Sequence, residues 1–284
     1  MKYVVITGVS TGMGRATAED LAAHGYHVFG SVRLEADATE LQGKLGQNFT
    51  PLLFDVTNES AVKAAADKVA EILNGHGLTG LINNAGIALS GPLMHMPLDR
   101  LRRQFEVNVI GLFAVTQAFL PLLGAKLAQT HPPGRIINMS SVGGRIAFPF
   151  MGAYAGSKHA VEGMSDALRR ELLIYGIDVI VIQPGSVRTA IWDKAEQEEL
   201  SPYADTDYID IMREFQKAVL EMGRAGVPPE VVSRTIRHAL ETDRPKTRYA
   251  LPDNYIMTWL LPRLLPDRWL DRLVASRIGL GRKK

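Results

Sequence analysis

The sequence predicts an α/β fold in which one doubly wound parallel sheet carries helices on both faces. Short runs of β-branched residues alternate with helical patterns, which is typical of parallel strands joined by crossover helices. The motifs that carry chemistry follow predicted strands, at the edge where open α/β sheets bind ligands. No linker-like change in composition interrupts the 284 residues, so we expect a single domain.

The predicted elements repeat with the period of a strand and its crossover helix. Apolar, β-branched stretches predict strands at residues 4–6, 27–30, 50–54, 80–82, 135–140 and 178–182. Helical patterns cover residues 14–24, 60–73, 98–123 and 154–175, and Gly25 is placed to cap the first of these helices.

The composition is that of an ordinary globular protein, with 46% hydrophobic and 22% charged residues. A net charge of +2 is too small to predict a nucleic-acid partner and favours a small molecule. The chain has no cysteine, and its seven histidines are too scattered to predict a metal site. The first residues lead directly into a strand, which leaves no room for a targeting peptide, so we expect a cytoplasmic protein.

A glycine-rich turn follows the first predicted strand. Gly8, Gly12 and Gly14 are spaced G-x-x-x-G-x-G, which differs from the G-x-G-x-x-G of the general dinucleotide fingerprint. Residues without a β-carbon let the backbone approach a pyrophosphate, and the following helix offers free N–H groups. The turn therefore predicts a nucleotide site, although a glycine turn between strand and helix can also be purely structural.

Tyr154 and Lys158 lie four residues apart in a predicted helix, which places them on one face. A free phenol has a pKa of about 10, and a nearby ammonium lowers it towards working pH, where acid and base catalysis is most efficient. The pair therefore predicts proton transfer. Taken singly, Lys158 could be an exposed helix lysine, and Tyr154 a core aromatic residue with its hydroxyl at the surface.

Together these motifs resemble the classical short-chain dehydrogenase/reductase family over roughly residues 1 to 190. The resemblance rests, in family order and at family spacing, on residues 7–14, the run Asn83-Asn84-Ala85-Gly86, Asn108, Ser141, Tyr154, Lys158 and Pro184-Gly185. Looser similarity at residues 228–232 and 245–249 points to the hydroxysteroid and retinol dehydrogenase-like branch. The family implies one Rossmann-type catalytic domain.

The resemblance implies four catalytic residues. Tyr154 would donate a proton to the carbonyl oxygen in reduction, and Ser141, selected over Ser140 by its separation from the tyrosine, would hold that oxygen. Lys158 would bind the nicotinamide ribose and lower the pKa of the tyrosine. Asn108 would hold a water molecule in the proton relay, although it could instead kink a helix by bonding its own backbone.

The resemblance also implies a binding site for NADP(H) or NAD(H). Its residues would be Gly8, Ser10, Thr11, Gly12, Met13, Gly14, Arg33, Asp55, Val56, Asn83, Ala85, Gly86, Tyr154, Lys158, Pro184, Gly185, Val187 and Thr189. Asp55 would bind the adenine amine, unless it caps the next helix. Thr189 would bind the carboxamide.

The end of the second strand favours NADP(H) and leaves NAD(H) open. Val32 occupies the position where NAD-preferring relatives carry an aspartate, and Arg33 could bind a 2′-phosphate bidentately. Thr11 departs from another NADP pattern, which has a basic residue in the turn, and Glu35 is close enough to compete for Arg33. A solvated Arg33 is the alternative.

Residues 190–226 are predicted to form a lid over the substrate. Large apolar residues interrupt an irregular pattern of charge there, as expected of a segment that closes over an apolar ligand. Trp192, Met212, Phe215 and Met222, with Met94, Phe148 and Phe150, could line a wide hydrophobic pocket. Several of them could instead pack the lid helices against the body.

Residues 255–284 form an apolar and basic tail that is too short and interrupted to span a bilayer. It could lie on an anionic membrane, cover the substrate entrance or form a subunit interface. Its basic residues are Arg263, Arg268, Arg272, Arg277, Arg282, Lys283 and Lys284. The family's use of helices 101–123 and 154–175 as a contact face implies a homodimer or homotetramer.

The sequence thus predicts an oxidoreductase that transfers a hydride between NADP(H) and a hydrophobic alcohol or carbonyl with a steroid-like, retinoid-like or aromatic skeleton. An NAD-dependent dehydrogenase of a smaller xenobiotic alcohol is the alternative within the enzyme class. Some proteins of this fold bind nucleotide as redox sensors with little catalysis, but this chain retains both the tyrosine and the lysine.

Overall fold

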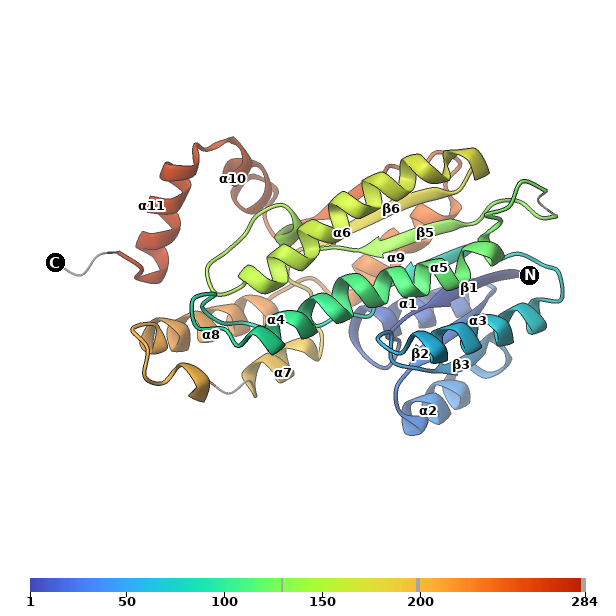
Figure 1. Cartoon of the computed structure of the whole chain (residues 1–284), viewed down its shortest axis with the longest axis horizontal. Coiled ribbons are helices and arrows are strands. Elements are labelled where there is room, and N and C mark those ends of the chain that lie inside the picture. Colours follow the sequence, from blue (N-terminus) through green and yellow to red (C-terminus); the bar gives the residue numbers. More distant parts are fainter. Residues whose placement is uncertain (129, 198–199, 282–284) are drawn as a thin grey trace.

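In the computed structural model, which describes residues 1–128, 130–197 and 200–281, seven parallel strands form one sheet in the order β3-β2-β1-β4-β5-β6-β7 (Figure 1). The strands are β1 (Lys2–Ile6), β2 (Tyr26–Val32), β3 (Phe49–Leu53), β4 (Gly80–Asn83), β5 (Arg135–Met139), β6 (Asp178–Pro184) and β7 (Arg248–Leu251). The chain winds outward from β1 in one direction and from β4 in the other, so the predicted doubly wound α/β fold is confirmed.

The first six strands lie where the sequence predicts them, within a few residues at their ends. The seventh strand, β7, is absent from the prediction because its residues, Arg-Tyr-Ala-Leu, include no β-branched side chain. All four are partly exposed at the edge of the sheet, where no long apolar run is needed.

Helices cover both faces of the sheet (Figure 1). One face carries α1 (Gly12–Ala23), α2 (Glu35–Leu45) and α9 (Pro229–Glu241), and the other carries α3 (Glu59–Leu73), α5 (Leu112–Phe119) and α6 (Gly152–Glu171). The remaining helical segments are η1 (Gly46–Asn48), α4 (Leu98–Phe105), η2 (Glu106–Gly111), η3 (Leu120–Leu123), η4 (Val142–Gly144), η5 (Leu172–Tyr175), α7 (Ile191–Glu196), η6 (Ser201–Tyr203), α8 (Ile209–Arg224), η7 (Tyr255–Leu260), α10 (Leu261–Leu264) and α11 (Asp267–Ile278).

The two faces have separate hydrophobic cores, which the alternation of side chains in β1 explains. Val4 and Ile6 are buried against α1 and α9, whereas Val5 between them is buried against α3 and α5. Because both faces of β1 are covered, its buried part, Val4-Val5-Ile6, is a continuous apolar run.

The helix predicted at residues 98–123 consists of four shorter segments. A π turn, η2, separates α4 from α5, and the 3₁₀ turn η3 ends the run. Within the described residues, Leu98–Leu123 is the one helical stretch that is long and apolar enough to cross a membrane, but half of its apolar window is buried, as in a core helix.

Segments of the predicted lid and tail lie at the same end of the molecule, where Figure 1 shows α8 and α11 near each other. Ile278 and Leu280 of the tail pack against a buried cluster that includes Tyr203 and Met212 of the lid. Glu198 and Glu199 of the lid, the side chain of Arg263, and Arg282, Lys283 and Lys284 of the tail lie outside the residues that the structure describes.

Candidate active site

The glycine turn between β1 and α1 is shaped by close packing. Gly8 and Gly12 have φ angles of +70° and +61°, a region that favours glycine. A Cβ on Gly14 would lie 2.2 Å from the carbonyl oxygen of Gly8 and 2.4 Å from Nδ2 of Asn84. Thr11 precedes α1 but does not cap it with its side chain, so the first N–H groups of the helix are available to an anion.

A cleft of about 410 Å³ runs along the carboxyl ends of the central strands. It is lined by these predicted nucleotide-binding residues: Gly8, Ser10, Thr11, Gly12, Met13, Arg33, Asp55, Val56, Ala85, Gly86 and Thr189. The turn, the uncapped helix and this cleft together fit an extended dinucleotide, with the pyrophosphate beside the turn.

Other residues predicted to bind the nucleotide are not among the described residues that line the cleft. Asn83 is buried, and its Nδ2 donates to Thr116 Oγ1 and Asn138 Oδ1, both at 2.9 Å. Val187 is buried in the core beside α9. Gly185 packs against Asp253, whose carboxylate would lie 2.9 Å from an added Cβ.

Asp55 lies between two arginine side chains at one end of the cleft. Its Oδ2 is 3.7 Å from Nη1 of Arg33 and 3.7 Å from Nη2 of Arg103. Partial burial acts to raise the pKa of Asp55, but hydrogen bonds from Thr57 and the charges of Arg103 and Arg33 outweigh it and hold the pKa below its usual value. Asp55 does not cap the next helix, because Asn58 does so by accepting from the N–H of Ala61.

Tyr154 and Lys158 occupy consecutive turns of α6 and face the same side. Lys158 Nζ lies 5.8 Å from the centroid of the tyrosine ring and donates to the carbonyl oxygen of Met139 at 2.7 Å. Ser141 accepts from the N–H of Gly143 at 3.0 Å and forms a side-chain hydrogen bond with Tyr154. The three residues that the sequence predicts for proton transfer are therefore neighbours.

The protonation of this group is governed by burial. Burial lowers the pKa of Lys158 to about 8, although the charge of Glu162 opposes the shift. Burial raises the pKa of Tyr154, and the hydrogen bond with Ser141 only partly offsets this effect. The sequence predicts that Lys158 lowers the pKa of Tyr154. In the structure the pKa of Tyr154 is raised, because desolvation of the phenolate dominates.

Asn108 lies in the π turn and connects two parts of the site. Its Oδ1 accepts from the N–H of Ile87 at 2.8 Å, and its Nδ2 donates to the carbonyl oxygen of Ile87 at 2.9 Å and to Ser157 Oγ at 3.0 Å. These bonds reach other elements and not its own helix. A Cβ on Gly86, which lines the cleft, would lie 3.2 Å from Asn108 Oδ1 and 3.8 Å from Lys158 Nζ. Gly86 therefore lies between the cleft and the residues predicted to be catalytic.

Part of the predicted substrate pocket packs the lid against the body. Phe150 lies 5.3 Å from Phe215 between ring centroids, and both contact the cluster that contains Met212. Phe150 has a φ of +65°, a strained conformation for a bulky residue that packing must maintain. Trp192 lies against Gly223, where a Cβ would be 2.2 Å from its ring.

The other residues predicted for this pocket present apolar surface to solvent. Met94, Phe148 and Met222 are 78%, 39% and 50% exposed. Some of the residues predicted for the substrate pocket therefore pack the lid, and the others expose apolar surface to solvent.

Asn84, Arg100 and Arg103 also line the cleft but are absent from the predicted site, although Asn84 belongs to the run on which the family resemblance rests. Asn84 Nδ2 donates to the carbonyl oxygens of Thr7 and Gly8, both at 2.9 Å. Asn83 is the last residue of β4 and Asn84 follows it. Successive side chains of an extended chain point to opposite sides, so a second amide directly after the buried Asn83 is a signal that could have identified Asn84. Arg100 and Arg103 are three residues apart on α4, which places them on one face.

Comparison with known proteins decides the family. A family model described as short chain dehydrogenase matches residues 2–200. The chain belongs to the short-chain dehydrogenase/reductase family. It is an NAD(P)-dependent oxidoreductase, as its sequence predicts, and its relatives include the retinol dehydrogenase-like members to which the sequence points.

Three similar proteins illustrate the match. An NADPH-dependent 3-dehydrocapnine reductase of Ornithobacterium rhinotracheale is 42% identical over 273 residues, which cover 96% of each chain. Human retinol dehydrogenase 16 is 33% identical over 292 aligned positions, covering 93% of this chain and 87% of the relative. The solved structure of a short-chain dehydrogenase from Streptomyces avermitilis is 26% identical, with a TM-score of 0.75 and coverage of 100% and 98%.

Proposed function

We propose that the protein is an NADP(H)-preferring enzyme that interconverts a hydrophobic alcohol and its carbonyl compound through Ser141, Tyr154, Lys158 and Asn108. The observation that carries the proposal is the position of Gly86. It lines the nucleotide-sized cleft and lies against the buried side chains of Lys158 and Asn108. A proton donor beside such a cleft is what carbonyl reduction requires.

In the direction of reduction, the Tyr154 hydroxyl gives its proton to the carbonyl oxygen of the substrate, and Ser141 Oγ donates a hydrogen bond to the same oxygen. NADPH, when bound, supplies the hydride. The Lys158 ammonium stabilises the phenolate that remains on Tyr154. Asn108 holds α6 in register with the loop after β4 through its bond to Ser157 Oγ.

The preference for NADP(H) rests on charge at the Asp55 end of the cleft. Val32 is buried and presents no carboxylate to a ribose 2′-hydroxyl. Two guanidinium groups, from Arg33 and Arg103, accompany the single carboxylate of Asp55, which leaves a positive surplus for a 2′-phosphate. The relative from Ornithobacterium rhinotracheale is named as NADPH-dependent, which supports the same preference.

Dissociation constants for NADPH and NADH test this preference. Arg33→Ala and Arg103→Ala should each weaken NADPH by about tenfold or more, because a hydrogen bond to a charged group is worth about 1.5–3 kcal/mol. NADH should change by less than about threefold in the same variants. Arg102→Ala is the matched control, because Arg102 lies on the same helix but pairs with Asp99 outside the cleft lining. Equal losses for both nucleotides would contradict the assignment.

The substrate is proposed to be hydrophobic because Met94, Phe148 and Met222 expose apolar surface near the lid and its neighbouring loops. The name of the relative gives 3-dehydrocapnine as a first compound to assay. NADPH oxidation should be followed with this compound, with steroid and aromatic ketones, with retinal, and with acetone as a small polar control. Faster turnover of acetone than of every hydrophobic compound would contradict the proposal.

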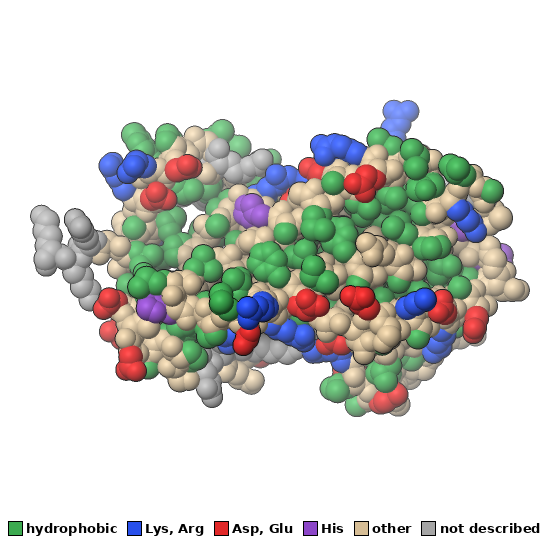
Figure 2. Space-filling view, viewed as in Figure 1, with side chains coloured by type: hydrophobic (Ala, Val, Ile, Leu, Met, Phe, Trp, Pro, Cys, Tyr) green, Lys and Arg blue, Asp and Glu red, His purple; other side chains and the backbone are tan. Residues whose placement is uncertain are grey.

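We also propose that copies of the chain associate through α4, α5 and α6. Figure 2 shows hydrophobic side chains gathered over these helices, and Leu98, Ile110 and Met164 are 63%, 49% and 40% exposed. Light scattering should give a dimer or tetramer for the wild type and a smaller species for Ile110→Glu/Met164→Glu. A monomeric wild type at about micromolar concentration, where specific interfaces form, would contradict this contact. Peripheral membrane contact of the tail and a cytoplasmic location stay predictions.

A further inference from the structure

A second cavity lies beside β7 and α9, and none of the described residues that line it also lines the nucleotide cleft. Its volume of about 690 Å³ falls within the range of about 300 to 1,000 Å³ that is typical of small-molecule sites. Helix α9 contributes Val231, Arg234, Thr235 and His238, which are spaced along one face of the helix.

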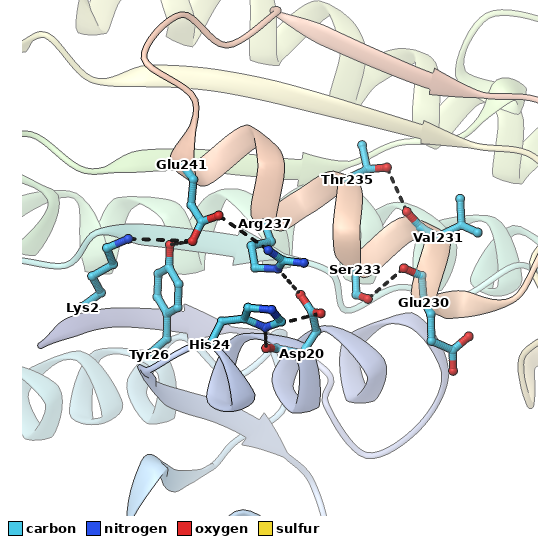
Figure 3. Close-up of polar contacts among 10 residues, drawn as sticks. All are labelled: Lys2, Asp20, His24, Tyr26, Glu230, Val231, Ser233, Thr235, Arg237 and Glu241. Carbon is cyan, nitrogen blue, oxygen red and sulfur yellow. Dashed lines mark hydrogen bonds and ion pairs between the residues drawn. The ribbon is translucent and has the colours of Figure 1, made fainter.

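The opposite face of α9 is occupied by its contact with α1. Figure 3 shows Arg237 reaching Asp20 of α1, and their Nε and Oδ2 atoms are 2.9 Å apart. Thr235 lies on the other side of the helix in the same view. The helix is therefore anchored by one face and offers the other to the cavity.

Ion pairs at the floor of the cavity hold two arginine side chains in place. Glu162, which is 4% exposed, accepts from Arg248 Nε at 2.9 Å and from Gln183 Nε2 at 2.8 Å, and lies 3.3 Å from Nη2 of Arg145. Arg248 also pairs with Asp166 at 2.9 Å. These bonds fix both guanidinium groups in place before any ligand binds.

Two further cationic side chains line the cavity and form no ion pair with any described residue. They are Arg234 and Lys246, and both are exposed. Four arginine and lysine side chains line the cavity, against the two carboxylates of Glu162 and Asp166 that pair with them. The site therefore keeps a positive surplus that a ligand can neutralise.

The remaining wall of the cavity is apolar. It includes Tyr249 and Leu251 of β7, Val231 of α9 and Trp259 of the tail, which is 6% exposed. The ring of Tyr249 lies 5.9 Å from that of His238, edge to face. Aromatic and aliphatic groups opposite cations recognise a molecule that has both an apolar body and an acidic group.

We propose that this second cavity binds a small organic anion, in which a sulfonate, phosphate or carboxylate group contacts Arg234 and Lys246 and an apolar body contacts Tyr249 and Trp259. The site does not depend on the function proposed for the nucleotide cleft. Glu162 lies one helical turn beyond Lys158, so an anion bound at the cavity would lie near the catalytic group without entering its cleft.

Calorimetry with naphthalene-2-sulfonate tests the site, with saturating NADPH present so that the probe cannot occupy the nucleotide cleft. Sodium sulfate provides the acidic group alone, and naphthalene-2-methanol provides the apolar body alone. The sulfonate should bind at least about tenfold tighter than either, because only it uses both kinds of contact. Equal affinity for the sulfonate and the neutral alcohol would overturn the assignment of an anion site.

Substitutions locate the binding. Arg234→Ala/Lys246→Ala should weaken naphthalene-2-sulfonate by at least about tenfold, because each cation contributes to binding the acidic group. Both side chains are exposed and form no ion pair with any described residue, so the fold should survive the change. Arg244→Ala is the control, because Arg244 is exposed in the loop before β7 but does not line the cavity.

The dissociation constant of NADPH separates this proposal from that for the cleft. It should stay the same in the double variant, whether or not the enzyme turns over any assayed substrate. Unchanged sulfonate binding in the double variant, or an equal loss in Arg244→Ala, would overturn the proposal.

Discussion

Replacing Gly14 with alanine tests whether the glycine turn is required by packing. A Cβ at this position would lie 2.2 Å from the carbonyl oxygen of Gly8 and 2.4 Å from Nδ2 of Asn84. That amide donates to the carbonyl oxygens of Thr7 and Gly8, both at 2.9 Å. The added methyl group therefore displaces the side chain that ties the loop after β4 to the turn.

The size of the effect follows from three contributions. Overpacking costs about 1–3 kcal/mol, and each of the two displaced hydrogen bonds is worth about 0.5–1.5 kcal/mol. Alanine offsets about 1 kcal/mol of this loss through its higher helix propensity. The free energy of unfolding should therefore fall by about 1–5 kcal/mol. In a large domain each kcal/mol lowers Tm by about 2–4 °C.

Thermal unfolding and NADPH titration measure the two consequences, a lower Tm and a larger Kd for NADPH. Gly43→Ala is the matched control, because Gly43 is also helical but an added Cβ would meet nothing within 4 Å. It should raise stability by up to about 1 kcal/mol. If Gly14→Ala gained stability as Gly43→Ala does and kept its affinity for NADPH, the packing argument would be refuted.

Three further predictions concern the buried polar groups. Burial lowers the pKa of Lys158 from 10.5 to about 8, so between those values the unfolded chain binds more protons, and stability should rise with pH by at most about 1.4 kcal/mol per pH unit. Urea unfolding at pH 8, 9 and 10 should show this rise in the wild type and a smaller one in Lys158→Met, and equal slopes would contradict it. Asn108→Ala leaves the N–H of Ile87 without its acceptor and should cost about 1–3 kcal/mol in urea unfolding, whereas an unchanged midpoint would sink that reasoning. Glu162→Gln removes a charge that raises the pKa of Lys158, so NMR titration of the lysine should give a lower pKa, and an unchanged value would argue against coupling through Glu162.

The fold could be predicted from the sequence because its central strands are buried on both faces. Val4, Val5 and Ile6 form an uninterrupted β-branched run for that reason. The edge strand β7 carries no such signal, since its residues are only partly buried. The break in the helix at residues 98–123 also depends on tertiary contacts, because Asn108 bonds to Ile87 and Ser157 and not within its own turn.

The site could be predicted in part. The glycine spacing and the separation of Tyr154 from Lys158 are local patterns, and the structure brings both to one cleft and its wall. The ion pair between Arg103 and Asp55 joins distant segments and has no local signal. The shift in the pKa of Tyr154 also depends on how deeply the side chain is buried, and burial cannot be predicted from the four-residue spacing to Lys158.

The most direct test of the account is the turnover of Tyr154→Phe with NADPH and the best hydrophobic carbonyl substrate of the wild type. Removing the hydroxyl takes away the proton donor, so kcat should fall by about 10²- to 10⁴-fold. NADPH should still bind with its wild-type Kd, because the substitution removes only the hydroxyl and Tyr154, although predicted to bind the cofactor, is not among the described residues that line the cleft. Turnover within about tenfold of the wild type, which corresponds to about 1.4 kcal/mol in the barrier, would contradict the assignment of Tyr154 as the proton donor.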